Sequence, residues 1–192
     1  MKSAPFAAAL LAGGRSLRFG SDKTTYVPPG LSVPLWRLQL DKLMAIGAAE
    51  VVLSVAASGP GFAPPPEVRV IADAFPDQGP LGGLASVLGS IDSPRVIVLG
   101  IDMPAVTVPG LHQLLAASDG DRGLVPHLQE RWEPLLAIYP RNLAELARTR
   151  LARGERSLQG FVEAGIAIGG LDSWPVGPEA AGWFVNLNRP VE

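Results

Sequence analysis

The stretch Arg95-Val-Ile-Val-Leu99, which runs on into Gly-Ile-Asp-Met-Pro104, carries the clearest strand signal in this sequence. A continuous β-branched and aliphatic run of this kind is typical of a strand buried on both faces of a sheet. Asp102 follows directly after the predicted strand, and Pro104 would fix the turn behind it. In sheets of parallel strands, ligands bind outside the carboxyl ends of the strands. The position of Asp102 therefore makes it a candidate functional residue.

Strand and helix patterns alternate on both sides of this stretch. The predicted strands cover residues 6–11, 50–55, 68–71, 95–99 and 135–139. The predicted helices cover residues 81–90, 108–117 and 142–153, and a segment that begins after Pro34 and is capped near Gly47. This alternation predicts an α/β fold with a mostly parallel central sheet. Residues 13–23, Asp73 and 100–104 follow predicted strands, so we expect them to face a ligand.

The composition is that of a folded domain. With 192 residues, 47% of them hydrophobic and 18% charged, the chain can bury a sizeable core, and we expect residues 1–192 to form a single domain. The net charge of −2 predicts no long-range attraction to nucleic acid or to an anionic membrane. The early apolar run, residues 5–12, is far shorter than the roughly 20 residues of a spanning helix. A buried strand explains it better than a secretory signal does, so we expect a cytoplasmic location.

The lack of cysteine and the small number of histidines exclude several kinds of catalytic and metal site. Cysteine is absent, which excludes disulfides, thiolate zinc sites and a catalytic thiol. His112 and His127 are the only histidines, so a His-rich metal site is excluded as well. Neither histidine lies in a pattern that resembles a Ser–His–Asp triad, and we expect both to be surface or structural residues.

The segment after the first predicted strand reads Leu11-Ala-Gly-Gly-Arg-Ser-Leu-Arg-Phe-Gly-Ser-Asp-Lys23. Its glycines allow backbone amides to approach a ligand, and its arginines and Lys23 supply positive charge, a combination that suits a triphosphate. It is not a P-loop, because two residues separate Gly20 from Lys23. It is not a dinucleotide fingerprint either, because Gly13 and Gly14 are adjacent. The alternative is a flexible glycine turn with surface cations.

Two carboxylates follow later predicted strands. Asp73 precedes the run Gln78-Gly-Pro-Leu-Gly-Gly83, whose glycines at a helix start would leave amides free. Asp102 is well placed to hold Mg²⁺, a hard cation that prefers one or two carboxylates together with phosphate oxygens. The alternative for each aspartate is a structural cap of a turn or helix.

Two further segments lie near the end of the sequence. They are Arg153-Gly-Glu-Arg-Ser157 and Phe184-Val-Asn-Leu-Asn-Arg-Pro190. Asn186 and Asn188 are two residues apart, so on a strand their amides would point the same way toward a polar ligand. Surface loops and turns are the alternative for both segments.

Taken in order, these segments resemble the molybdenum cofactor guanylyltransferase family, a branch of the sugar-nucleotide-type nucleotidyltransferases. The family pattern is L-A-G-G-x-S-x-R-M/F-G-x-D-K, then D with G-P-L-x-G, then D-M/T-P, then N-x-N-x-P. The matching positions here are 11–23, Asp73 with 79–83, 102–104 and 186–190, and Glu133-Pro134 and Gly154-Glu-Arg-Ser157 match as well. The resemblance covers nearly the whole chain.

The resemblance implies a three-layer nucleotidyltransferase sandwich that binds Mg-GTP. The enzyme would transfer GMP to the terminal phosphate of molybdenum-bound molybdopterin and release pyrophosphate, with other proteins of cofactor biosynthesis as possible partners. Residues 1–105 would form the nucleotide half and residues 106–192 the acceptor half. Lys23 would balance triphosphate charge and Asp102 would ligate Mg²⁺, so these two are the implied catalytic residues. The implied nucleotide-binding residues are Leu11, Ala12, Gly13, Gly14, Arg18, Lys23, Ser54, Asp73 and Asp102. The implied acceptor-binding residues are Arg156, Asn186 and Asn188.

The sequence departs from the family pattern at two places. Residues 24–34 replace a shorter path to the first helix, and Val33 stands where the family has Lys. Ser54 stands where the family often has Asn near the base, so guanine specificity stays open. The alternatives are a related transferase that uses CTP or another phosphorylated acceptor, and a non-catalytic nucleotide-binding protein of the same fold. The presence of both Lys23 and Asp102 argues against the last of these.

Overall fold

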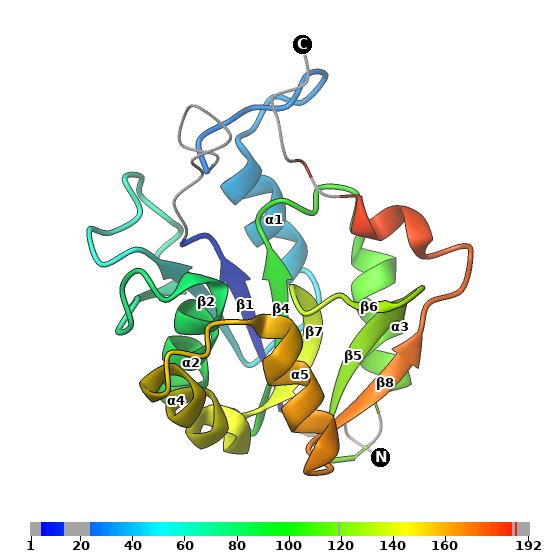
Figure 1. The fold of residues 1–192 in the computed structure, drawn as a ribbon. Coiled ribbons are helices and arrows are strands. Elements are labelled where there is room, and N and C mark those ends of the chain that lie inside the picture. The colour runs from blue at the N-terminus through cyan, green and yellow to red at the C-terminus, as the bar shows by residue number, and fades with distance from the viewer. Residues whose placement is uncertain (1–4, 14–23, 119, 186, 188–192) are drawn as a thin grey trace.

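A mixed sheet lies at the centre of the computed structural model, which describes residues 5–13, 24–118, 120–185 and 187 (Figure 1). Within these residues the sheet has eight strands, in the order β3-β2-β1-β4-β7-β5-β6, with β8 paired to β5. The strands are β1 Ala7–Leu11, β2 Glu50–Val55, β3 Val68–Ala72, β4 Arg95–Gly100, β5 Gly123–Leu128, β6 Arg131–Trp132, β7 Leu136–Pro140 and β8 Leu171–Pro175. The helices are α1 Leu35–Met44, α2 Gly79–Ser90, α3 Val108–Ala117, α4 Ala144–Ala152 and α5 Leu158–Ala167, with short 3₁₀ turns at Arg141–Leu143 and Ala181–Phe184.

The first four strands are parallel, as the sequence predicted. β1 lies between β2 and β4, and Leu11 at its end is level with Ser54 on one side and Gly100 on the other. All five residues of β1 are buried, because helices cover both faces of the sheet at this point. The carboxyl ends of β1, β2 and β4 therefore lie at one level on the same edge of the sheet.

The second half of the sheet is largely antiparallel. β7 runs antiparallel to both β4 and β5, and β5 and β6 form a hairpin. β8 returns parallel to β5. The sequence predicted β7 but not β5, β6 and β8. β5 and β8 carry polar residues and proline, which weaken a strand signal.

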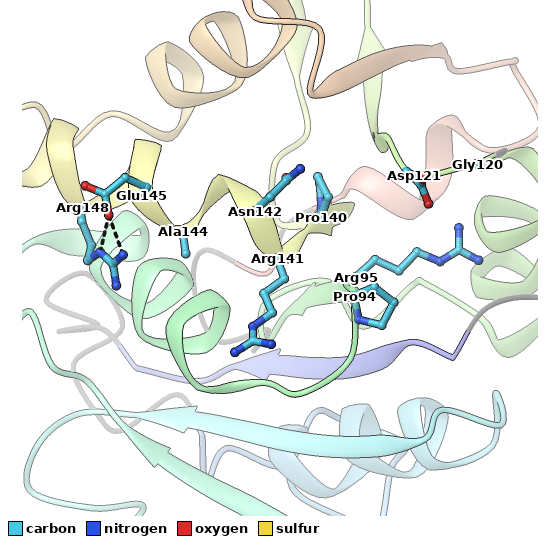
Figure 2. A pocket seen from close by; sticks show the side chains of 10 residues that line it. All are labelled: Pro94, Arg95, Gly120, Asp121, Pro140, Arg141, Asn142, Ala144, Glu145 and Arg148. Atoms are coloured by element: carbon cyan, nitrogen blue, oxygen red, sulfur yellow. Dashed lines mark hydrogen bonds and ion pairs between the residues drawn. The ribbon is translucent and has the colours of Figure 1, made fainter.

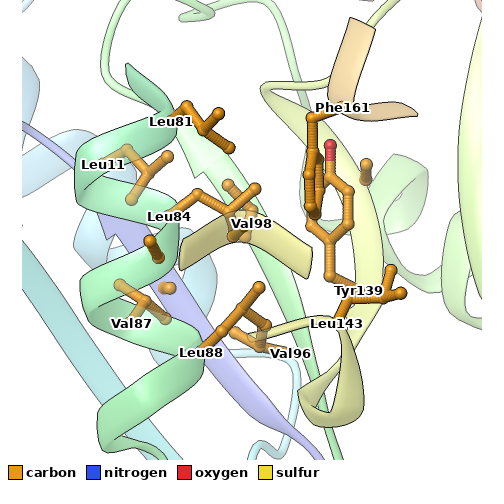
Figure 3. Close-up of a cluster of buried hydrophobic side chains, with 14 of the residues drawn as sticks. Leu11, Leu81, Leu84, Val87, Leu88, Val96, Val98, Tyr139, Leu143 and Phe161 are labelled. Atoms are coloured by element: carbon orange, nitrogen blue, oxygen red, sulfur yellow. The ribbon is translucent and has the colours of Figure 1, made fainter. Parts of the chain in front are cut away.

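Helices cover both faces of the sheet and give the molecule three layers (Figure 1). α1 and α3 pack on one face, and α2, α4 and α5 pack on the other. Figure 3 shows the buried apolar cluster on the face covered by α2, α4 and α5. In it, Leu84 and Leu88 of α2 lie beside Val96 and Val98 of β4. Burial of each such leucine stabilises the fold by roughly 1.5–3 kcal/mol. This architecture confirms the three-layer α/β sandwich.

Residues that start and end helices lie at the observed helix boundaries. α1 begins directly after Pro34, and Gly47 behind it has a positive φ of 75°. In α3, the Thr107 hydroxyl accepts a hydrogen bond from the Gly110 amide at 3.2 Å. Ser157 caps α5 in the same way, through the Gly160 amide. No helix among the described residues is long and apolar enough to cross a membrane.

One buried side chain ties the antiparallel half to the loop before β7. Tyr139 is fully buried, and its hydroxyl donates to the Pro134 carbonyl at 2.8 Å. Burial raises the pKa of this phenol well above its ordinary value, so the hydroxyl keeps its proton and remains a donor.

We predict that Tyr139→Phe lowers the free energy of unfolding by about 1–2 kcal/mol, because the Pro134 carbonyl would lose its buried partner. The melting temperature should fall by roughly 2–8 °C for a chain of this length. Urea unfolding and thermal melting of the two proteins check this. Equal stability of Tyr139→Phe and the wild-type protein would show that the bond contributes nothing.

Candidate active site

Backbone hydrogen bonds join the loops that leave the four parallel strands. The Ala12 amide donates to the Ser54 carbonyl at 2.9 Å, and the Asp73 amide donates to the Val55 carbonyl at 2.9 Å. The Ile101 amide donates to the Leu11 carbonyl at 3.3 Å. These bonds continue the strand ladders by one step beyond the sheet. The segments after β1, β3 and β4 therefore meet at one edge, as predicted.

A cavity of about 700 Å³ opens at this edge. Its lining comes from the ends of β1, β2 and β3 and the start of α2: Gly13, Ala56, Ala57, Ser58, Asp73, Pro76, Asp77, Gly79 and Pro80. The size is within the usual range for small-molecule sites. Two predicted nucleotide-binding residues, Gly13 and Asp73, line it. A side chain at position 13 would crowd the cavity mouth, because its Cβ would lie 3.2 Å from the carbonyl carbon of Val55.

Asp73 is held by its own loop. Its Oδ1 accepts from the Phe75 amide at 2.8 Å and lies 3.1 Å from the Ser86 hydroxyl oxygen. Two fixed contacts on one oxygen set the orientation of the carboxylate, so the other oxygen has a defined direction at the cavity. Asp73 therefore caps its own turn and also lines the cavity, so a structural role does not exclude a role in ligand binding.

Backbone hydrogen bonds hold the loops of the site at Leu11, Ala12 and Ser54. The Ser54 side chain is 1% exposed, and its hydroxyl oxygen would lie 3.2 Å from a Cβ built on Gly83. It is not among the residues that line the cavity, so its hydroxyl is turned toward α2 rather than toward a ligand. Its carbonyl instead holds Ala12 in place, and the buried Leu11 holds Ile101.

The loop that carries Asp102 is fixed at several points. The Gly100 amide donates to the Leu135 carbonyl at 2.7 Å, and the Leu187 amide donates to the Asp102 carbonyl at 2.8 Å. A Cβ at Gly100 would lie 3.0 Å from Oδ1 of Asp102 and 3.1 Å from the Leu135 Cβ. Glycine at position 100 therefore leaves the space that the Asp102 carboxylate occupies.

The donor set at this edge fits a hard divalent cation that is bound together with a nucleotide. Among the described residues, no group of three or more His, Cys, Asp or Glu side chains converges to cage a metal. Mg²⁺ usually takes one or two carboxylates and completes its shell with water and substrate phosphates. Asp102 supplies a carboxylate of this kind at the same edge of the sheet, although it does not itself line the cavity.

Glu133 is a further carboxylate that the sequence marked only as part of a matching pattern. It is half-buried between β6 and β7, and its amide donates to the Pro126 carbonyl at 2.9 Å. Burial raises the pKa of Glu133, and the negative charge of Asp102 raises it further against the opposing charge of Arg131. Glu133 is therefore an electrostatic neighbour of Asp102.

α1 supplies two polar side chains that sequence reasoning missed. Gln39 is fully buried, and its amide nitrogen donates to the Gly100 carbonyl at 3.2 Å. Lys42 donates from Nζ to Gln39 Oε1 and to the Pro104 carbonyl, both at 2.8 Å. Burial lowers the pKa of Lys42 from 10.5 to about 8. The signal available in the sequence was a glutamine on the apolar stripe of the helix, four residues from both Leu35 and Leu43.

Five of the predicted site residues are not among those that the structure describes. Gly14, Arg18, Lys23, Asn186 and Asn188 lie outside the described residues. The chain just after Lys23 is anchored on α1, because the Trp36 amide donates to the Thr24 carbonyl at 3.2 Å and the Leu35 amide donates to the Tyr26 carbonyl at 2.9 Å.

Arg156 is exposed just before α5 and does not line the cavity. Gln159, one turn later, holds β6 through both the amide and the carbonyl of Trp132, at 3.2 and 2.8 Å. His127 packs against Trp132 in a tilted arrangement, with 4.4 Å between ring centroids, and His112 is exposed on α3.

A second cavity, of about 600 Å³, lies at the amino end of β4 and so at the opposite end of the sheet from Asp102 (Figure 2). Arg95, Arg141 and Arg148 contribute to its lining. Figure 2 shows their guanidinium groups pointing in different directions, and Arg148 is already held by Glu145 at 2.5 Å. These cations do not converge on one ligand position, so we assign the candidate active site to the edge that carries Asp102.

Comparison with known proteins identifies the class. The family model of the MobA-like NTP transferase domain matches residues 8–166. A relative from Opitutus terrae, named "Probable molybdenum cofactor guanylyltransferase", is 34% identical over 97% of this chain and 92% of its own length. The fold is therefore that of a nucleotidyltransferase. The chain belongs to the MobA-like NTP transferase family.

Solved structures show the same fold. Molybdopterin-guanine dinucleotide biosynthesis protein A from Archaeoglobus fulgidus superposes with a TM-score of 0.74 at 23% identity, covering 96% of this chain and 93% of its own. The protein Rv0371C from Mycobacterium tuberculosis, in a complex with manganese, superposes with a TM-score of 0.62 at 13% identity, covering 90% of this chain and 89% of its own.

The lowered pKa of Lys42 predicts how stability depends on pH. Below pH 8 the ammonium is charged in both states, so the cost of burying it is fully present. Between about pH 8 and 10.5 the unfolded chain binds more protons than the folded chain, so the free energy of unfolding should rise with pH. The slope for one proton is at most about 1.4 kcal/mol per pH unit.

Urea unfolding of the wild-type protein and of Lys42→Met at pH 7, 8, 9 and 10 measures this slope by difference. We expect the free energy of unfolding of the wild type to rise relative to that of Lys42→Met between pH 8 and 10. Parallel pH curves for the two proteins would contradict the shift.

Proposed function

We propose that this protein is a molybdenum cofactor guanylyltransferase that moves GMP from Mg-GTP to the terminal phosphate of molybdenum-bound molybdopterin and releases pyrophosphate. One observation carries the proposal. The cavity that Gly13 and Asp73 line and the loop that carries Asp102 lie at the same edge of the sheet, joined by the bond from Ile101 to Leu11. A nucleotide in the cavity can therefore extend its phosphates toward the carboxylate of Asp102.

The reaction balances without a strong base. An oxygen of the acceptor phosphate attacks the α-phosphorus of GTP, the bond from the α-phosphorus to the bridging oxygen breaks, and pyrophosphate leaves. The acceptor oxygen is already ionised, so the protein mainly positions the two substrates and stabilises charge. When bound, Mg²⁺ supplies neutralisation of the phosphate charge.

Asp102 would hold the metal, and the residues of the first half would hold the nucleotide. In this proposal Leu11, Ala12, Gly13 and Gly14 offer backbone groups, and Asp73 directs its outer oxygen at the nucleotide. Arg18 and Lys23 would balance the phosphate charge. Ser54 would act through the carbonyl that fixes Ala12, since its hydroxyl is turned away.

The acceptor would approach from the second half of the chain. Arg156 is exposed, and a planar guanidinium suits phosphate oxygens. Asn186 and Asn188 flank Leu187, whose amide is bonded to the Asp102 carbonyl. This bond supports the view that the two asparagines act beside the metal-bound phosphates rather than at a distant pterin pocket. The charge of Asp102 also acts on Glu133, whose pKa it helps to raise after burial.

A CTP-dependent transfer is the second candidate, and one observation favours it. The wall of the cavity that follows β2 offers Ala56, Ala57 and Ser58 rather than an asparagine. Few side chains on this wall can therefore form hydrogen bonds that distinguish one nucleotide base from another.

We also propose a cytoplasmic location for the protein, and delivery of the acceptor by other proteins of cofactor biosynthesis.

A nucleotide panel tests the function. Calorimetry with GTP, CTP, ATP and UTP, each with Mg²⁺, should show tight binding of GTP alone, followed by GMP transfer to the molybdenum cofactor. Asp102→Ala should abolish transfer while the circular dichroism spectrum stays unchanged, because the metal loses its carboxylate. Preference for CTP would overturn the guanylyl assignment, and normal turnover of folded Asp102→Ala would overturn the metal assignment.

Two further variants separate the nucleotide site from the acceptor site. Lys23→Ala should slow transfer by roughly 30- to 1,000-fold, since it removes a charge-assisted contact that strengthens in the transition state, on the order of 2–4 kcal/mol. Arg156→Ala should raise the KM for the acceptor and leave GTP affinity nearly unchanged. Loss of GTP affinity in Arg156→Ala with normal acceptor binding would move Arg156 into the nucleotide site.

A further inference from the structure

Two side chains of α1 hold the two ends of the loop that carries Asp102. Gln39 bonds the Gly100 carbonyl at one end of the loop, and Lys42 bonds the Pro104 carbonyl at the other. Lys42 also donates to Gln39 Oε1, so the two side chains form one unit. Asp102 lies midway between the two anchored carbonyls.

This arrangement is costly in terms of stability alone. A fully buried amide and a partly buried ammonium lose their hydration, and apolar side chains of similar size would fill the same space without that loss. The packing of α1 on the sheet is already supplied by apolar residues such as Leu35, Leu40 and Leu43. Burial also lowers the pKa of Lys42, which records the cost of placing a charge there.

The amino end of the same helix bonds a second segment of the chain. The Leu35 and Trp36 amides bond the carbonyls of Tyr26 and Thr24, directly after Lys23 in the chain. α1 therefore contacts both residues 24–26, which follow the glycine loop in the sequence, and the loop that carries Asp102. A rigid helix that bonds both segments fixes the spacing between them.

We propose that Gln39 and Lys42 are positioning residues that act through the backbone of residues 100–104 to set the Asp102 carboxylate for metal binding. The inference rests on the proposed function, because it takes Asp102 as the metal-binding residue. Outer contacts that orient a metal ligand typically change metal affinity by 10- to 100-fold when they are removed.

The test measures Mn²⁺ binding to the full chain by electron paramagnetic resonance, with the nucleotide that the panel selects. Gln39→Met and Lys42→Met remove the donors and keep the side-chain volume. Each should weaken Mn²⁺ binding by about 10-fold or more. Nucleotide affinity in EDTA should stay unchanged, and the transfer rate at low metal should fall and recover in part with excess Mn²⁺.

Matched controls separate positioning from stability. Arg37→Ala breaks an exposed pair with Asp41 on the same helix, 2.8 Å in length, and should leave Mn²⁺ affinity at the wild-type value. Lys42→Arg keeps a cation that can reach the Pro104 carbonyl and should restore most of the affinity lost in Lys42→Met. If Gln39→Met does not fold, Gln39→Asn, which is too short to reach the Gly100 carbonyl, takes its place.

The outcomes are distinct. Normal Mn²⁺ affinity in the folded Gln39 and Lys42 variants, with only the melting temperature lowered, would overturn the inference. Normal Mn²⁺ affinity in Asp102→Ala would instead overturn the proposed metal site itself. Loss of affinity in Asp102→Ala, Gln39→Met and Lys42→Met, with Arg37→Ala unchanged, supports both.

Discussion

The parallel register of β1 between β2 and β4 is the constraint on which the site depends. Leu11 is level with Ser54 and with Gly100, so the chain leaves all three strands at one height. A slip of one residue would turn every side chain of a strand to the opposite face of the sheet. The burial of all five residues of β1 prevents such a slip, because both faces are packed against helices. Core packing therefore fixes where Gly13 and Asp102 lie.

Charge is the second determinant of the site. The described part of this edge carries the carboxylates of Asp73, Asp102 and Glu133, and burial together with Asp102 raises the pKa of Glu133. A nucleotide triphosphate would add several more negative charges to the same edge. In the proposed reaction, a substrate would bind such a surface only if cations came with it, and a divalent metal bound to the phosphates would supply part of that charge. The complex of metal and nucleotide would still be negative, so the proposal also requires basic side chains.

Sequence reasoning succeeded where the signal is local. The strands at 50–55 and 95–99 and the helix at 108–117 coincide with β2, β4 and α3 to within a residue, because apolar periodicity and capping decide them. β5, β6, β8 and α5 were not predicted, since short strands that contain proline and polar residues and a helix that contains glycine have weak propensities. The positions of Gly13, Asp73 and Asp102 at the carboxyl ends of strands could be predicted from the strand pattern, while their roles stay predictions. The contacts of Gln39 and Lys42 could not be predicted, because each bonds a residue more than sixty positions away.

The two proposed halves of the chain meet at the loop that carries Asp102. The loop around Asp102 belongs to the first half, yet its backbone is bonded to Leu135 and Leu187 of the second. In-line transfer requires the attacking oxygen to lie within about 3–3.5 Å of the α-phosphorus. The acceptor phosphate must therefore reach the same loop that faces the nucleotide. This loop is bonded to β1, to α1, to Leu135 and to Leu187. Contacts from both halves therefore fix its position, which would allow it to align the nucleotide with the acceptor.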